Sequence, residues 1–288
     1  LGPMWVNHQV NWFNDSFLSF KDHDKYLIVI YLIKNNLDFL ARNFHTVDYN
    51  QFYLNGSIEI EKLNIIEISK ALNIPKETTR RKVDELQNLG AITKHKKKIF
   101  IDRSVYTYVK PLKLIQNISH FLSFFSKMLL DKNNISKSYS STELQKIIEE
   151  KFSYFWKIYY ELQIPMALAY KKIFKDLETF HIFGTCVNSQ HLYAKRSSED
   201  NMDRDEFIDS TYTPDKMTGI NAMSISDITG IPRATVIRKL EKLLKQKKLK
   251  IDNKKHYKLT GNFINELKPT QKAVLIDLAN FSTKIYNL

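Results

Sequence analysis

Basic and hydroxyl side chains recur in the same order at two places in this chain, about 157 residues apart, in segments 65–92 and 223–249. The matched positions are Ile74-Pro75 with Ile231-Pro232, Thr78 with Thr235, and Arg81-Lys82 with Arg238-Lys239. Arginine can form two hydrogen bonds to guanine in the major groove of DNA, whereas lysine and threonine suit phosphate oxygens. The spacing therefore indicates nucleic-acid recognition, carried twice by one chain.

Each segment also has the pattern of two helices joined by a short turn. In the first segment, 65–72 is predicted to form one helix and 73–74 the turn. Pro75 is expected to start the second helix, and Gly90 suits the left-handed residue that closes it. The second segment has Lys247 at the closing position. A short basic strand pair is predicted to follow each segment.

The pattern IPxxTxxRKxxxL resembles the winged helix-turn-helix of bacterial transcription regulators. It is most similar to the DNA-binding domain of the cyclic-nucleotide-responsive regulators, and the second segment, with PRATV, is also similar to the IclR type. The resemblance covers about 40 residues in each unit. No cyclic-nucleotide-binding domain is apparent, so that ligand does not carry over, and no cofactor or effector is assigned.

The resemblance implies that the early turns of each second helix contact DNA. It places base contacts at Lys76, Glu77 and Arg81, with Thr78 on a phosphate. Ala234 replaces the acidic residue in the second unit, so a cytosine contact is not carried over there. The predicted helix contacts are Lys76, Glu77, Thr78, Arg80, Arg81, Arg233, Thr235, Arg238 and Lys239. The predicted contacts from the wings are Lys94, Lys96, Lys97, Lys98, Lys254 and Lys255.

The positive charge is concentrated at the same two places. The whole chain has a net charge of +13, of which residues 73–98 carry +5 and residues 231–258 carry +9. All other residues together come to about −1. Two basic runs that each coincide with the matched motif are typical of surfaces that face phosphates.

Helical periodicity surrounds both units. Proline is expected to open an apolar helix after each unit, and Ser140 with Glu143 has the pattern of a capping box. Pro165 is expected to end or kink the helix that the capping box opens. The predicted flanking helices are 24–42, 112–130, a helix from 140, 166–183 and 270–286.

The expected fold is mainly α with small β wings, as tandem winged helix-turn-helix domains joined and flanked by amphipathic helices. The expected domains are 4–131 and 140–288, with a linker at 132–139 and a flexible acidic insertion at 184–219 that is either a solvated loop or a shield for the basic surface. Leu1-Gly2-Pro3 resembles a protease-cleavage scar, which makes Met4 the expected native start.

No catalytic constellation or phosphate-binding glycine loop stands out, and no enzyme activity is expected. His181, Cys186 and His191 are spaced by five residues, which matches no zinc-binding pattern, so no metal site is assigned. No apolar run is long enough to span a membrane. Aromatic residues at helical spacing are expected to form core, or else to line a ligand pocket or a homodimer seam. These residues are Phe121, Phe124, Phe125, Trp156, Tyr159 and Tyr160.

These features favour a sequence-specific, double-stranded DNA-binding transcription regulator in the bacterial cytoplasm, associated with the nucleoid. A plasmid or phage replication initiator, which also places two winged domains in tandem, is the alternative. A chromosome-segregation scaffold with paired winged domains is less favoured, because it has no need of basic charge confined to the two matched segments.

Overall fold

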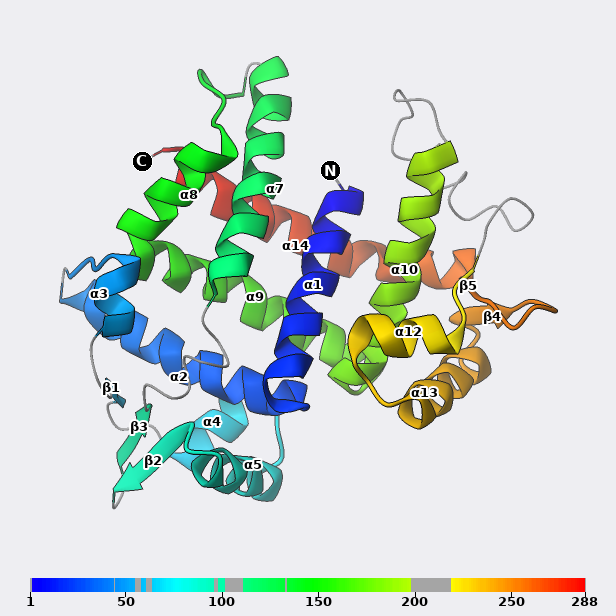
Figure 1. Ribbon diagram of the computed structural model, residues 1–288, viewed down its shortest axis with the longest axis horizontal. Coiled ribbons are helices and arrows are strands. Elements are labelled where there is room, and N and C mark those ends of the chain that lie inside the picture. Colours follow the sequence, from blue (N-terminus) through cyan, green and yellow to red (C-terminus); the bar gives the residue numbers. More distant parts are fainter. Residues whose placement is uncertain are drawn as a thin grey trace. The chain divides into compact units, whose positions relative to one another are not determined.

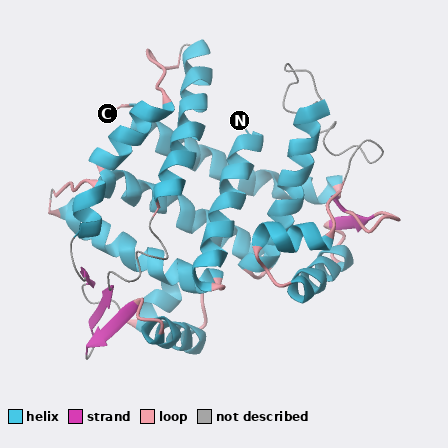
Figure 2. Cartoon of the chain, viewed as in Figure 1, coloured by secondary structure: helices cyan, strands magenta, loops and turns pink. Residues whose placement is uncertain are grey.

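The computed structural model is mostly helical and contains two small antiparallel sheets (Figures 1 and 2). The residues that it describes are 2–43, 45–54, 58–60, 64–95, 98–101, 111–132, 134–197 and 219–287. This composition confirms the predicted mainly α fold with small β elements. Below, the first repeat is residues 64–101 and the second repeat is residues 221–259.

The chain divides into two compact units, each built from two stretches of sequence. The first-repeat unit consists of Asp22–Ala169 and Val274–Leu288, and the second-repeat unit of Leu1–Lys21 and Tyr170–Ala273. Each unit is named after the repeat that it contains. Every unit therefore combines residues from distant parts of the sequence.

This division differs from the predicted domains 4–131 and 140–288. The first helix, α1 (Gly2–Phe20), packs against α10 and α12 of the second-repeat unit. Amphipathic patterning shows that a helix buries one face, but not which partner covers that face. For this reason the packing of α1 was not available from the sequence.

In the first-repeat unit, side-chain caps start several of the helices, and the cap of α8 is the one that the sequence predicted. The Asp22 side chain accepts hydrogen bonds from the N–H groups of Asp24 and Lys25 and so caps α2. Ser140 and Glu143 form the expected capping box of α8. The helices are α2 (His23–Arg42), α3 (Tyr49–Leu54), α4 (Ile65–Leu72), α5 (Lys76–Asn88), α7 (Leu112–Asp131) and α8 (Ser141–Glu150).

The first-repeat unit also holds one three-stranded sheet, with the order β1-β3-β2. Its strands are β1 (Ile58–Ile60), β2 (Ile92–His95) and β3 (Lys98–Ile101). Most of the aromatic residues expected in core or seam are buried in this unit: Phe121, Trp156, Tyr159 and Tyr160. Phe124 is 40% exposed. The homodimer seam stays a prediction.

In the second-repeat unit, α10 packs against α1, α12 and α13 (Figure 1). The remaining elements are α10 (Leu177–Ser197), α12 (Ala222–Thr229), α13 (Arg233–Lys245), β4 (Leu249–Ile251) and β5 (Tyr257–Leu259). Side chains from all of these elements and from α1 meet in one apolar core. Members of that core are Phe17, Phe183, Ile225, Val236, Leu240, Leu243, Leu249 and Leu259. Burial of this core fixes α13 on the unit.

Two prolines lie inside helices that contribute residues to both units. Pro165 is within α9 (Phe152–Phe174), and Pro269 is within α14 (Gly261–Tyr286). The prediction that a helix starts at 270 is therefore wrong. The helix that the capping box opens, α8, ends at Glu150, and Pro165 lies inside the next helix, α9, so the predicted helix 166–183 is wrong as well. An internal proline removes one backbone hydrogen bond. In each helix, apolar residues before and after the proline are buried: Ile164, Met166, Leu267 and Val274.

The expected flexible insertion at 184–219 is wrong for its first part. Residues 184–197 form the second half of α10. Cys186 and Gln190 are buried there, and Gln190 accepts a hydrogen bond from the N–H of Leu259 in β5 at 2.8 Å. These polar side chains give no apolar periodicity, which is why the sequence did not predict the helix. The acidic residues 199–215 lie outside the described residues.

Two buried histidines make the second-repeat unit sensitive to acid. Burial lowers the pKa of His8 to about 3 and that of His191 to about 4. Both side chains are neutral in the folded unit, whereas in the unfolded chain they take up a proton below pH 6.5. The stability that depends on these neutral side chains is therefore fully present above pH 6.5. It falls as the pH drops towards the folded-state pKa values of about 4 for His191 and about 3 for His8.

When the pH is lowered from 7 to 5, each of these histidines is expected to lower the free energy of unfolding by roughly 2 kcal/mol. Urea unfolding of the wild-type chain and His8→Gln at both pH values measures this loss. The His8→Gln variant should lose less stability on acidification, whereas His45→Gln, at an exposed histidine, should behave like the wild type. Identical pH dependence in His8→Gln and the wild type would contradict the assignment.

Candidate nucleic-acid interface

Each repeat begins with a short helix that an asparagine caps. Asn64 Oδ1 accepts hydrogen bonds from the N–H groups of Ile66, at 2.9 Å, and Glu67, at 3.1 Å, where α4 starts. Asn221 Oδ1 accepts one from the N–H of Ser224, at 2.9 Å, where α12 starts. Asparagine thereby satisfies N–H groups that have no partner inside the helix. The two repeats start in the same way at matching positions.

The turn after that helix is also the same in both repeats. Asn73 and Gly230 adopt left-handed backbone conformations, with φ of 48° and 69°. Pro75 and Pro232 follow with φ of −52° and −53° and precede α5 and α13. In each turn a serine hydroxyl donates a hydrogen bond to an isoleucine carbonyl. The pairs are Ser69 with Ile74 and Ser226 with Ile231, both at 2.7 Å.

The end of the second helix is closed by a left-handed residue in each repeat. Gly90 has φ of 72°, as predicted, and its N–H donates to the Gln87 carbonyl at 2.9 Å. Lys247 has φ of 54°, and its N–H donates to the Leu244 carbonyl at 2.9 Å. Lysine is rare in this conformation because its Cβ crowds the backbone. The second repeat keeps the geometry even without glycine.

A hairpin follows the second helix in both repeats. In the first, β2 pairs antiparallel with β3, with Ile92 opposite Ile101. In the second, β4 pairs with β5, with Leu249 opposite Leu259. β1 lies on the other side of β3, and Ile220 bridges to β5 in the corresponding place. The two hairpins therefore share a strand order as well as a position.

A buried lysine, Lys82, ties the second helix of the first repeat to the start of α2. Lys82 Nζ forms an ion pair with the Asp22 carboxylate and lies 3.9 Å from Asp24 Oδ2. Burial opposes ionisation of Asp22, but the hydrogen bond and charge of Lys82 outweigh it and lower the pKa of Asp22. The carboxylate that caps α2 therefore also neutralises a lysine of α5.

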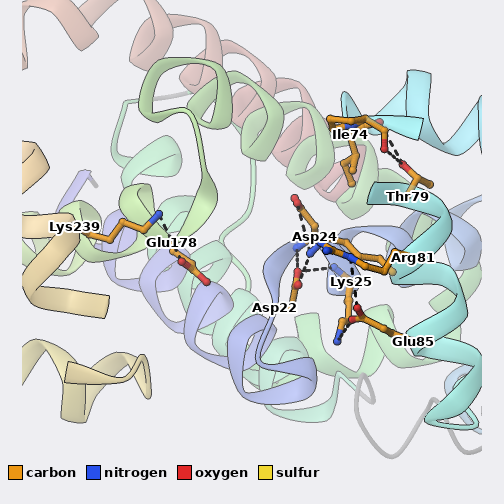
Figure 3. A network of polar contacts seen from close by, with 11 residues as sticks. Asp22, Asp24, Lys25, Ile74, Thr79, Arg81, Glu85, Glu178 and Lys239 are labelled. Atoms are coloured by element: carbon orange, nitrogen blue, oxygen red, sulfur yellow. Dashed lines mark hydrogen bonds and ion pairs between the residues drawn. The ribbon is translucent and has the colours of Figure 1, made fainter. Parts of the chain in front are cut away.

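The second repeat has the same arrangement around Lys239. Its Nζ lies 2.7 Å from Asp176 Oδ1 and 3.6 Å from Glu178 Oε2 at the start of α10 (Figure 3). Burial raises the pKa of the Asp176 carboxyl. Hydrogen bonds from Lys239 and Thr179 lower that pKa by more, so the net shift is downward. Lys239 is 9% exposed. The prediction that Lys239 contacts DNA is therefore replaced by a structural role.

The acidic partners were missed in the sequence, although a signal for them exists. Residues 20–22 and 174–176 both read Phe-Lys-Asp, and each is followed two residues later by an acidic residue. Lys21 and Lys175 both have positive φ, at 52° and 73°. The internal repeat thus begins further upstream than the matched motif.

The other predicted helix contacts lie on the outer side of α5 and α13. Exposed side chains are Lys76, Glu77, Arg80, Arg81, Arg233 and Arg238, and Thr78 and Thr235 are half-buried. The neighbouring residues that were expected to face the core are buried: Thr79, Val83, Leu86, Val236, Leu240 and Leu243. Each repeat therefore displays basic and hydroxyl groups on the first turns of its second helix.

The structure describes the predicted wing contacts unequally. Lys254 and Lys255 are exposed in the β4–β5 turn, where Asp252 Oδ1 accepts from the Lys254 N–H at 3.0 Å. Lys94 Nζ pairs with Asp84 Oδ1 at 2.6 Å. The remaining residues, Lys96 and Lys97 and the side chain of Lys98, lie outside what the structure describes.

The histidines and the cysteine of α10 do not form a reactive site. Burial raises the pKa of Cys186 to about 12, so its thiol stays protonated. His181 Nε2 forms a 2.7 Å hydrogen bond with Asn14 Oδ1 of α1. Among the described residues, no three His, Cys, Asp or Glu side chains are grouped as metal ligands would be.

Comparisons with protein-family models, curated proteins and solved structures give no match to this chain. In the part of the chain that the structure describes, no helix combines the length and apolar character needed to cross a bilayer.

We expect Lys239→Met to lower the unfolding free energy by roughly 1–3 kcal/mol, because Asp176 loses the cation that offsets its burial. Arg238→Ala, one residue away and exposed, should leave stability unchanged. Adding Asp176→Asn to Lys239→Met should recover part of the loss, since asparagine still caps α10 without a charge. Urea unfolding of the three variants makes the comparison. A Lys239→Met chain as stable as the wild type would show that the pair does not hold α13.

Proposed function

We propose that this protein binds double-stranded DNA through two winged helix-turn-helix units, one in each repeat. In each unit, α4 or α12 is the first helix, α5 or α13 is the recognition helix, and the following hairpin is the wing. A recognition helix of this kind enters the major groove with its first turns against base edges. The exposed side chains on those turns are of the types that hydrogen-bond to bases and phosphates.

The observation that carries the proposal is the position of Arg81 and Arg238. Both lie exposed at the same place on the second helix, and in both repeats the next residue is a lysine used internally. Since the two repeats share caps, turn and hairpin, they present these arginines in the same local frame. Arginine at such a place suits the two acceptors of guanine.

The charge distribution supports the same conclusion. Residues 73–98 and 231–258 carry the whole basic excess of the chain, which favours a polyanionic partner. A sequence-specific transcription regulator acting at the bacterial nucleoid accounts for two recognition helices of unlike sequence. Sequencing of DNA bound in the cell distinguishes this role from replication initiation, for which iterated sites beside one origin are expected.

Duplex binding should depend steeply on salt. If six or more phosphates are neutralised, affinity is expected to fall by about 10³-fold or more between 50 and 200 mM salt. A mobility-shift or fluorescence-anisotropy titration across that range measures the effect. An affinity that does not change with salt would rule out the proposed phosphate contacts.

Variants at exposed positions should separate base contacts from backbone contacts. We expect Arg81→Ala and Arg238→Ala to weaken binding to a selected duplex far more than to a scrambled one, by about 1–3 kcal/mol. Lys254→Ala, in the wing, should weaken binding to both duplexes alike. Equal losses on the two duplexes for the arginine variants would instead assign those residues to the backbone.

A further inference from the structure

The second helices of the two repeats, α5 and α13, differ in how much of their positive charge is not paired with a carboxylate. α5 has four basic and three acidic residues, whereas α13 has five basic and one acidic residue. Lys82 and Lys239 each form an ion pair inside their own unit, so neither is counted among the exposed charges of its helix. The exposed charges of α5 then balance, while those of α13 leave a clear positive excess.

Two matched positions produce most of this difference. Glu77 of α5 corresponds to Ala234 of α13, and Glu85 corresponds to Lys242. Arg80 Nη2 lies 2.7 Å from Glu77 Oε2, and Arg81 Nε lies 3.7 Å from Glu85 Oε1. Both exposed arginines of α5 thus have carboxylate partners on their own helix.

Further pairs hold these carboxylates in place. Lys25 Nζ lies 2.7 Å from Glu85 Oε2, which fixes Glu85 beside Arg81 (Figure 3). The nearest wing lysine, Lys94, is paired with Asp84 of the same helix at 2.6 Å. All three carboxylates of α5 are therefore paired before any ligand is bound, and both exposed arginines of the helix have a partner.

α13 lacks these partners. Arg233, Arg238 and Lys245 are exposed, and no ion pair joins them to any carboxylate among the described residues. Lys242 lies 3.6 Å from Asp176 Oδ2 but keeps 37% of its side chain exposed. Arg238, Lys242 and Lys245 are spaced by four and three residues, so they share one side of the helix.

We propose that the two repeats divide the binding of DNA between them. The second repeat supplies most of the electrostatic affinity for the phosphate backbone through α13. The first repeat binds by exchange, in which Arg80 and Arg81 leave Glu77 and Glu85 for groups on the DNA. This inference rests on the proposed function and specifies how its two sites are used.

Exchange has a distinct signature in the salt dependence. A free cation that neutralises a phosphate releases the counterion condensed there, which gives a slope of about −0.9 per contact in log affinity against log salt. When an arginine leaves a carboxylate to reach a group on the DNA, the freed carboxylate attracts a cation in turn. Net counterion release per contact is then smaller for α5 than for α13.

The test uses the full chain with a duplex selected from random-sequence DNA, titrated from 50 to 200 mM salt. Lys245→Gln should reduce the magnitude of the slope by about 0.9, as for a phosphate contact, and Arg238→Gln, which removes a positive charge from the same helix, should also reduce it. The matched variant Arg81→Gln should reduce it by less than half as much. On a scrambled duplex, where Glu77 makes no selected base contact, Glu77→Gln should tighten binding by about two- to fivefold, because its ion pair with Arg80 no longer competes.

Exchanging the charges at one matched position should exchange the behaviour of the two repeats. In the double variant Glu85→Lys with Lys242→Glu, Arg81→Gln should reduce the slope more than Arg238→Gln does. Because Glu85 also pairs with Lys25, thermal unfolding of each variant is measured beside binding. Glu77→Gln provides a second measurement that leaves the Lys25 pair intact.

The outcomes separate this inference from the proposed function. Equal slope changes for Arg81→Gln and Arg238→Gln, together with unchanged affinity in Glu77→Gln, would overturn the division of binding while DNA binding stands. Absence of salt-dependent duplex binding by the wild-type chain would overturn the proposed function, and this inference with it.

Discussion

One carboxylate that serves two elements at once is the interaction on which each repeat depends. Asp22 caps α2 and pairs with Lys82 of α5, and Asp176 sits at the start of α10 and pairs with Lys239 of α13. A buried ammonium group is costly unless it is paired and hydrogen-bonded. The second helix of each repeat therefore has one favourable register against its supporting helix, and that register decides which side chains point outward.

The same constraint sorts the basic residues of the chain by role. Arg81 and Lys82 are neighbours in sequence, yet the first is exposed and the second is buried against carboxylates. A count of positive charge treats the two residues alike, whereas the fold leaves only one of them for a partner. The number of unpaired cations in each repeat is accordingly smaller than its number of lysines and arginines, and in the first repeat carboxylates on α5 pair with further cations.

Features set by short-range chemistry could be predicted from the sequence. The bounds of α4, the left-handed Gly90, the capping box at Ser140 and the inward face of α5 all follow from residues within one or two helical turns. Features set by distant residues could not. The packing of α1 on α10, the continuation of α9 through Pro165 and the burial of Lys239 depend on partners that periodicity does not identify. The role of Lys239 was wrong for that reason.

The way in which the units share the sequence has a consequence for how the chain folds during synthesis. The second-repeat unit needs the first 21 residues together with residues 170–273, and the first-repeat unit needs residues 274–288. α1 must therefore wait, with its apolar face uncovered, until α10 and α12 leave the ribosome. Neither unit can be completed before its later stretch has been synthesised, which ends at residue 273 in the second-repeat unit and at residue 288 in the first-repeat unit.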